Sequence, residues 1–339
     1  MIATTIKRLA LGALLASATA VSAFAAETTL IISSWAPPTH GINAMAWPKL
    51  ISMIEEATEG RVTAEIKYQL APPPAQFDLV QDGAADLTWI FHGYNPGRFV
   101  ATKLIELPGY EGNAEAASVA YQRAHEKFFA AADEHRGVKL VALHTHGVGV
   151  LHSDRKVTSL DEISGMKLRL GGGVSNDVGQ ALGATAINVP APKVYETLAS
   201  HAADGVMMPM EGKASFKLYE VAKNTFTVPG GFYRGSFAVI MNQEKFDSLS
   251  EADQKALDAI FGEKTAAEFG KVWDAIDKIG EKAAMDTEGA TITAASEADT
   301  AKWAELTGPI ISKVVDEVSA KGIDAKAAME FIANEMKNM

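Results

Sequence analysis

Strand and helix patterns alternate along the first part of the sequence, and this alternation constrains the fold more than any other feature. Three segments are typical of strands: residues 28–35, 61–68 and 84–91. Two segments between them, residues 44–59 and 75–83, have apolar side chains at helical spacing. This βαβαβ order with right-handed crossovers predicts a parallel sheet covered by helices.

The same alternation resumes in the second part of the chain and predicts another open α/β lobe. The expected strands are 138–147, 165–170, 185–190, 203–209 and 235–242, and the expected helices are 176–184 and 193–200. A chain of 339 residues is near the size at which one hydrophobic core divides into two. We therefore expect two lobes, joined by strands that cross between them.

The first 26 residues have the features of a secretory signal peptide. Lys7 and Arg8 precede the apolar run LALGALLASATAVSAF, and Ala23-Phe24-Ala25 has the small-x-small form of a cleavage site. We expect cleavage near Ala25 or Ala26 and export to the periplasm. The mature chain contains no cysteine, so its core alone must stabilise it.

Charge and hydropathy exclude two classes of partner. The formal net charge is −11, and removing the two basic residues of the leader gives −13. Nucleic acids and anionic membranes require a basic face, so neither is an expected partner. After the leader no stretch reaches 18 apolar residues, so the mature chain is not expected to be embedded in a membrane.

A long helical segment follows Ser250, which is expected to cap it. If residues 251–285 form an unbroken helix, its 35 residues at about 1.5 Å each give roughly 53 Å. Such a helix is either part of a coiled coil or a strut along both lobes, although Gly262 and Gly270 weaken the helical pattern.

Arg169 is the first candidate for ligand binding. In the segment GMKLRLGGG, Met166, Leu168 and Leu170 alternate with polar residues, so Arg169 stands near the end of a strand before three glycines. One interpretation is a solvated edge strand followed by a flexible turn. The other is a guanidinium that binds a carboxylate through two parallel hydrogen bonds, beside the free N–H groups of a helix that Asn176 opens. The glycines lack the full G-x-G-x-x-G spacing, which argues against a dinucleotide site.

The histidines of HTHG suggest a competing interpretation. His144 and His146 lie on the same side of a predicted strand, and His152 follows closely, so they could bind a metal ion in a secreted metal-dependent hydrolase. The sequence contains no HExxH and no acidic residue that completes a ligand set. Catalytic residues, a metal and a cofactor are therefore not expected.

Ligands of open α/β sheets bind beyond the carboxyl ends of the strands, so the candidate ligand-binding residues are sought in six loops that adjoin predicted strands. These are residues 34–41, 89–95, 144–149, 169–176, 207–211 and 230–234. The candidate ligand-binding residues in them are Arg169, Trp35, His40, Trp89, Phe91, His92, Tyr94, His146, Met208 and Phe232.

Several stretches in order resemble one family, the extracytoplasmic solute-binding proteins of tripartite ATP-independent periplasmic (TRAP) transporters, of the DctP type. The resemblance covers about residues 28–320 and rests on SSWAPPTHG, IEEATEGRVTAEI, LVQDGAADLTW, LDEISGMKLRL, ALGATAINVPAPKVYETLASHAADGV and FDSLSEADQKAL. It implies a non-enzymatic periplasmic-binding-protein clamshell with a long helix across both lobes. It also implies that Arg169 binds the ligand's carboxylate and that the ligand is delivered to the small and large subunits of a membrane permease.

On this basis we expect lobe I to comprise residues 27–147 and 235–275, and lobe II residues 148–234 and 276–339. The pocket departs from the family where many relatives have Glu-Asn, because Met207 and Met208 stand there. Relatives that bind sugar acids carry polar residues in place of Phe91 and Tyr94. The departures favour an organic monocarboxylate with an apolar body, first a hydroxybenzoate-like aromatic acid, whose hydroxyl would meet His92 or His146, and second a short 2-oxo or branched acid.

Overall fold

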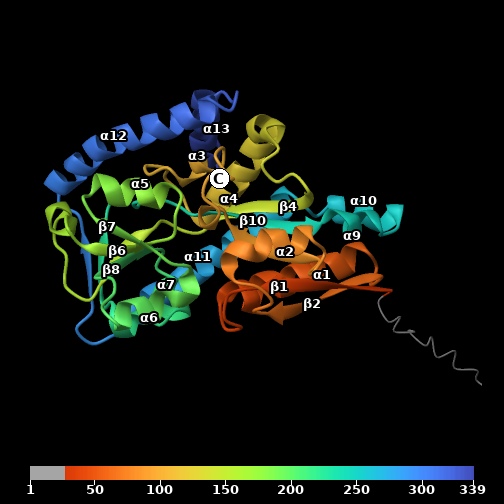
Figure 1. Ribbon diagram of the computed structural model, residues 1–339, viewed down its shortest axis with the longest axis horizontal. Coiled ribbons are helices and arrows are strands. Elements are labelled where there is room, and N and C mark those ends of the chain that lie inside the picture. Colours follow the sequence, from red (N-terminus) through yellow and green to blue (C-terminus); the bar gives the residue numbers. More distant parts are fainter. Residues whose placement is uncertain (1–26) are drawn as a thin grey trace, which may run out of the picture.

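The computed structural model describes residues 27–339 and places them in two lobes, each built on one β-sheet (Figure 1). The predicted signal peptide lies outside the described residues. Both sheets are mixed and flanked by helices, which confirms the predicted α/β class. The strands are β1 (Thr28–Ser34), β2 (Val62–Tyr68), β3 (Leu87–Phe91), β4 (Val138–Thr145), β5 (Val150–Ser153), β6 (Lys167–Leu170), β7 (Thr185–Asn188), β8 (Gly205–Met208), β9 (Asn224–Thr227), β10 (Ser236–Asn242) and β11 (Thr291–Ala294).

The helices lie over both faces of the sheets and at the ends of the molecule (Figure 1). They are α1 (Trp47–Ala57), α2 (Gln76–Gln81), α3 (Lys103–Glu106), α4 (Ala114–Ala124), α5 (Val174–Ala181), α6 (Val194–Ala199), α7 (Gly212–Ser215), α8 (Leu218–Val221), α9 (Gln243–Asp247), α10 (Glu251–Asp258), α11 (Glu263–Asp286), α12 (Glu297–Ser319) and α13 (Ala325–Lys337).

The first lobe contains the sheet β2-β1-β3-β10-β4. β1 pairs in parallel with β2 and β3, as the βαβαβ pattern predicts, and β10 runs antiparallel to both of its neighbours. α1 covers this sheet with Trp47, Leu50 and Ile54, which recur at helical spacing and are buried. Four strands therefore share one direction, and their carboxyl ends face the second lobe.

The second lobe contains the sheet β11-β9-β5-β8-β6-β7. β6 pairs in parallel with β7 and β8, while β5 runs antiparallel to β8 and β9. The sequence patterns did not predict β5, β9 or β11, each of which has four residues. Pairing with neighbouring strands determines these short elements.

Two extended segments connect the lobes and pair with each other. Residues 146–149 lead from β4 to β5, and residues 228–235 return from β9 to β10. The Gly149 N–H donates to the Tyr233 carbonyl at 2.7 Å, and the Phe232 N–H donates to the Gly149 carbonyl at 2.9 Å. This antiparallel pair is the strand connection that the sequence analysis expected, and it lies beside α11.

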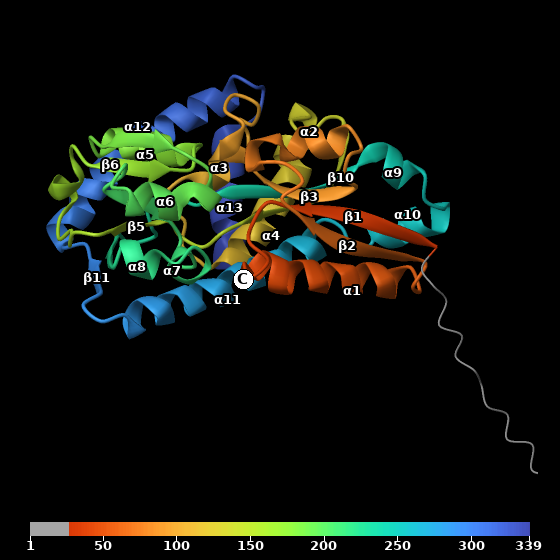
Figure 2. The ribbon, with the colours of Figure 1, turned by 60° about the horizontal axis from the view of Figure 1, so that its bottom comes forward.

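α11 is the long helix that spans both lobes. It contacts α4 and β4 of the first lobe and α7 and β11 of the second, and Figure 2 shows it running between these parts of the molecule. The helical segment over 251–285 is interrupted near Gly262, because α10 ends at Asp258 and α11 starts at Glu263. Gly262 between them has φ +74°, a conformation that ends a helix and favours glycine.

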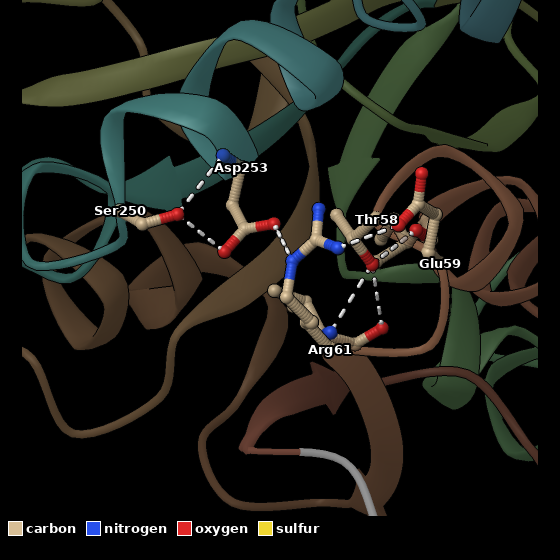
Figure 3. A network of polar contacts seen from close by, with 7 residues as sticks. Thr58, Glu59, Arg61, Ser250 and Asp253 are labelled. Atoms are coloured by element: carbon tan, nitrogen blue, oxygen red, sulfur yellow. Dashed lines mark hydrogen bonds and ion pairs between the residues drawn. The ribbon is translucent and has the colours of Figure 1, made fainter. Parts of the chain in front are cut away.

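Hydrogen bonds attach the start of α10 to the edge of the first lobe (Figure 3). Ser250 caps the helix by accepting from the Asp253 N–H at 3.1 Å, and its hydroxyl donates to the Asp253 carboxylate at 2.6 Å. Arg61 Nε donates to the same carboxylate at 2.9 Å, while Arg61 Nη1 lies 3.0 Å from Glu59. The predicted cap at Ser250 is thus present, and Arg61 connects it to the turn before β2.

The C-terminal segment forms two helices that contact both lobes. α12 packs against α5 and α3, and α13 packs against α4 and α3. Among residues 27–339, no helix is both long and apolar enough to cross a membrane.

Candidate functional site

A cavity with about 40 Å³ of space accessible to a water-sized sphere lies between the two lobes, and both connecting segments contribute to its wall. Its wall is mainly aromatic, with a few polar side chains among the rings. The lining residues are Trp35, His40, Phe91, Tyr94, His146, Arg169, Gly171, Ala191, Met208, Pro209, Glu211, Phe216, Tyr233, Phe237 and Trp273. A concave, largely apolar cavity with few polar groups is typical of a small-molecule site.

Arg169, the third residue of β6, reaches the cavity with a buried side chain that is 3% exposed. Its Nε donates to the Val189 carbonyl at 2.8 Å, and Nη2 lies 3.3 Å from the Tyr94 hydroxyl. No carboxylate among residues 27–339 forms an ion pair with this guanidinium. The protein thus orients the group from one side and leaves its charge without a counter-ion in the part of the chain that the structure describes.

Tyr94 connects the two lobes beside Arg169. Its hydroxyl accepts from the Ala191 N–H at 2.8 Å, and its ring packs edge-on against Phe91 with centroids 4.8 Å apart. Because Tyr94 follows β3 and Ala191 follows β7, this hydrogen bond joins the first lobe to the second. The position of Tyr94 therefore depends on how close the lobes are.

Stacked rings form the apolar part of the wall. Trp35 lies on Trp89 with centroids 4.1 Å apart and an interplanar angle of 14°. Trp89 is fully buried behind Trp35 and stacks in turn on Phe237 at 5.5 Å. The indole N–H of Trp35 donates to the Trp89 carbonyl at 2.9 Å, so the ring that faces the cavity is fixed in orientation. Such a wall favours a flat, apolar ligand body.

Three further polar groups line the cavity: His40, His146 and Glu211. Burial lowers the pKa of His40 to about 3 and that of His146 to about 4, so both rings are neutral near pH 7. His146 Nδ1 lies 2.6 Å from the Gly147 carbonyl oxygen, so Nδ1 carries the proton and donates it to that oxygen. The Gly235 N–H also points to Nδ1, but this contact is longer, at 3.3 Å, and does not decide the tautomer. Burial raises the pKa of Glu211 to about 8.

The cavity brings together seven of the ten residues predicted from the sequence: Trp35, His40, Phe91, Tyr94, His146, Arg169 and Met208. Trp89 supports Trp35 from behind. His92 points elsewhere, because its ring nitrogens lie 3.0 Å from Ser236 Oγ and 2.9 Å from His135 Nε2. Phe232 packs against Trp303 at 5.1 Å and does not line the cavity.

The remaining lining residues were not selected from the sequence, although four of them, Gly171, Pro209, Glu211 and Tyr233, lie in the loops identified there. Glu211 and Tyr233 belong to the 207–211 and 230–234 loops, so the position of their loops was the available signal. Trp273 lies in the middle of α11, at helical spacing from the buried residues Phe269 and Ile276. Its indole N–H donates to His144 Nδ1 at 3.0 Å, which places His144 in the aromatic core.

The glycines after Arg169 allow the lobes to approach each other closely. A Cβ on Gly172 would lie 2.1 Å from the Gly93 carbonyl oxygen, and a Cβ on Gly173 would lie 2.2 Å from Glu106 Oε2. The helix after the loop begins at Val174, two residues before Asn176. Its Val174 N–H donates to Glu106 Oε2 at 2.8 Å, so a carboxylate of the chain itself occupies the site where we had expected a ligand anion.

A metal centre has no support in the structure. Among the described residues, 27–339, no group of three or more histidine, aspartate or glutamate side chains could hold a metal ion. The ring of His152 lies between Thr225 Oγ1 at 3.1 Å and the Pro209 carbonyl at 3.2 Å, away from His144 and His146.

Comparisons with known proteins agree with this description. Residues 32–317 match the family described as bacterial extracellular solute-binding protein, family 7 (DctP). A TRAP periplasmic solute-binding protein from Bordetella bronchiseptica, solved with bound (R)- and (S)-mandelate, is 36% identical, with a TM-score of 0.88 over 91% of this chain and 99% of that one. Family members and structural neighbours of this kind are substrate-binding proteins of transporters and not enzymes, so the hydrolase interpretation has no support.

Two further solved structures are similar over the same range. A marine metagenome TRAP solute-binding protein specific for aromatic acids, in complex with 3-hydroxybenzoate, is 29% identical, with a TM-score of 0.86 over 93% of this chain and 99% of that chain. A TRAP solute-binding protein from Rhodoferax ferrireducens, in complex with copurified benzoate, is 25% identical, with a TM-score of 0.85 over 91% of this chain and 98% of that chain.

Proposed function

This chain belongs to family 7 of the bacterial extracellular solute-binding proteins, the binding proteins of TRAP transporters, and we propose that it captures an aromatic monocarboxylate between its lobes. The predicted signal peptide places the mature protein in the periplasm, where it delivers the ligand to the small and large subunits of a membrane permease. The lobe boundaries of the sequence analysis, 27–147 with 235–275 and 148–234 with 276–339, remain part of this proposal.

The observation that carries the proposal is a buried arginine without a counter-ion. Arg169 is 3% exposed, lines the cavity and forms no ion pair among residues 27–339. Burying an unpaired charge is costly, and a ligand carboxylate bound by two parallel hydrogen bonds would remove that cost. The hydrogen bonds to Val189 and Tyr94 orient the guanidinium before the ligand arrives.

The aromatic wall supports a flat apolar body rather than a hydroxyl-rich one. Trp35, Phe91 and Phe237 can contact an aryl ring but cannot hydrogen-bond to the several hydroxyls of a sugar acid. Each unpaired hydroxyl would cost about 1–3 kcal/mol. The mandelate, benzoate and 3-hydroxybenzoate bound by the similar proteins are all aromatic carboxylates.

Calorimetry of Arg169 variants tests the proposal. The probes are mandelate, benzoate and 3-hydroxybenzoate, with glucuronate, succinate and pyruvate as the other acid classes. We expect Arg169→Ala and Arg169→Lys to lose about 3–5 kcal/mol of binding free energy for the aromatic acids, at least a 100-fold rise in Kd. The lysine variant should also lose affinity, because an ammonium group cannot form the two parallel hydrogen bonds that a guanidinium forms with a carboxylate.

The control is Arg155→Lys, which makes the same substitution at an exposed position of the second lobe and should leave Kd unchanged. Binding of glucuronate or succinate in preference to every aromatic acid would contradict the proposed ligand class. Unchanged Kd values in both Arg169 variants would remove Arg169 from the site.

A further inference from the structure

A second polar group of the cavity wall, Glu211, has no partner for one of its oxygens. Glu211 is 2% exposed, and Oε2 forms no hydrogen bond within residues 27–339. The backbone is held in place, because the Glu211 N–H donates to Asp277 Oδ1 of α11 at 2.8 Å. A buried carboxyl oxygen that faces a ligand cavity without a partner indicates a missing hydrogen-bond donor.

His40 presents a complementary group beside this oxygen. Its Nδ1 accepts from the Ile42 N–H at 3.2 Å, so the neutral ring carries its proton on Nε2. The rings of Trp89, Phe216 and Trp273 surround His40 at centroid distances of 5.6, 5.6 and 5.7 Å and fix its orientation. The Nε2–H group therefore points to a defined place in the wall.

The separation of the two groups leaves room for one shared partner. His40 Nε2 and Glu211 Oε2 are 3.6 Å apart, beyond the distance of a hydrogen bond between nitrogen and oxygen. A single atom can lie about 2.8 Å from each of them, which is the ordinary hydrogen-bond length. A ligand oxygen at that point would contact both groups.

We propose that His40 and Glu211 form a hydroxyl subsite, so that the ligand is an aromatic carboxylic acid carrying a hydroxyl group. This inference rests on the proposed function, in which Arg169 binds the carboxylate of the same ligand. The hydroxyl accepts from His40 Nε2–H and donates to Glu211 Oε2, and its rotation lets it serve both groups at once.

Other substituents fit the pair less well. An ammonium group has three donors and no acceptor, so it would satisfy Glu211 and leave the His40 N–H facing a cation. A carbonyl oxygen can accept from His40 and from a protonated Glu211, but it has no hydrogen to donate once that carboxyl is ionised, so it satisfies the pair in only one of the two protonation states. A hydroxyl can be both donor and acceptor, and it satisfies the pair in either protonation state of Glu211.

The test compares ligands that differ at one group. One series is mandelate with phenylacetate, phenylglycine and benzoylformate, which replace the hydroxyl with hydrogen, ammonium and carbonyl. The other is the three hydroxybenzoates with benzoate. Kd is measured by calorimetry for wild type, Glu211→Leu and Glu211→Gln, with the exposed Glu288→Leu as the matched control.

We expect at least one hydroxylated acid to bind wild type tenfold or more tightly than its parent. Glu211→Leu should abolish that gain, so that the hydroxylated acid and its parent bind this variant with Kd values within about threefold of each other, and Glu288→Leu should preserve the gain. Glu211→Gln keeps an acceptor oxygen at the site and should retain part of the gain, which provides a readout if the leucine variant does not fold.

The inference is overturned if no hydroxylated acid gains over its parent, if phenylglycine or benzoylformate binds more tightly than every hydroxylated acid, or if Glu211→Leu weakens parent and hydroxylated acids equally. Failure of the proposed function would give a different result from failure of the hydroxyl subsite. In that case no aromatic monocarboxylate, hydroxylated or not, would bind the wild-type protein.

Discussion

The contact between Gly172 and Gly93 provides a way to separate ligand binding from the fold of each lobe. Gly172 has φ +103°, and a Cβ there would lie 2.1 Å from the Gly93 carbonyl oxygen of the opposite lobe. The Gly93 oxygen belongs to the backbone, and the new Cβ would be bonded directly to the backbone of residue 172, so no side-chain rotation can relieve the overlap. Gly172→Ala can relieve it by moving the lobes apart by about 1 Å or more. We therefore expect this variant to fold but to close incompletely.

The hydrogen bonds between the lobes set the size of the effect. A shift of that size breaks the contacts from the Val174 N–H to Glu106 and from the Ala191 N–H to Tyr94, each 2.8 Å long. At about 0.5–1.5 kcal/mol for a neutral hydrogen bond and about 1.5–3 for a charged one, the closed form loses roughly 2–4 kcal/mol. Because binding is linked to closure, Kd should rise by roughly 30- to 800-fold.

Calorimetry and small-angle X-ray scattering measure the two consequences. The wild type with its tightest-binding aromatic acid at saturation should have a smaller radius of gyration than Gly172→Ala under the same conditions. The control is Gly165→Ala, which has φ +79° and no atom within 4 Å of the new Cβ. It carries similar backbone strain, so it should lose about 1 kcal/mol of stability and keep its Kd. A Gly172→Ala protein that binds and compacts like wild type would refute the reasoning.

Two further predictions concern stability. Burial lowers the pKa values of six histidines, for example to about 3 for His144 and to about 4 for His146. Below their unfolded pKa of 6.5 the unfolded chain therefore takes up protons that the native chain excludes. The carboxyl groups of Glu106, Glu211 and Asp277 have raised pKa values and act in the opposite direction, because the native chain keeps their protons. The unfolded chain therefore binds about three more protons than the native chain, and the free energy of unfolding should fall by about 4 kcal/mol between pH 6 and pH 5. Urea denaturation at the two pH values checks this, and equal stabilities would contradict it. Ser250→Ala removes the cap of α10 and should cost about 1 kcal/mol by the same assay, whereas a loss near zero would show that the contact between Arg61 and Asp253 holds the helix start by itself.

Much of the fold could be predicted from the sequence where a segment carries its own period. β1, β2 and β6 alternate along their lengths, and α1 shows an apolar stripe, so these elements and the parallel pairing followed directly. β5 and β9 could not be predicted, because their sequences, VLHS and NTFT, do not alternate as β6 does and their pairing partners are distant in sequence. The break at Gly262 depends on a backbone conformation that the helical pattern on either side conceals.

The candidate site shows the same division. Arg169 became a candidate because a charged residue near the carboxyl end of a strand is conspicuous in a period-two pattern, and the family resemblance then implied its role in binding a carboxylate. His92 was placed with the cavity because it follows Phe91, but a 3₁₀ turn over His92–Tyr94 directs its ring to Ser236 and His135. Trp273 reaches the cavity only through the packing of α11 across both lobes, which no local pattern reveals.

The most direct test of the account is a crystal structure of the protein with a bound aromatic acid such as mandelate. The account predicts the ligand carboxylate at about 2.7–2.9 Å from the Arg169 guanidinium nitrogens, with the aryl ring against Trp35. A ligand bound between the lobes whose carboxylate lies away from Arg169, with the guanidinium still held by Val189 and Tyr94 alone, would contradict it.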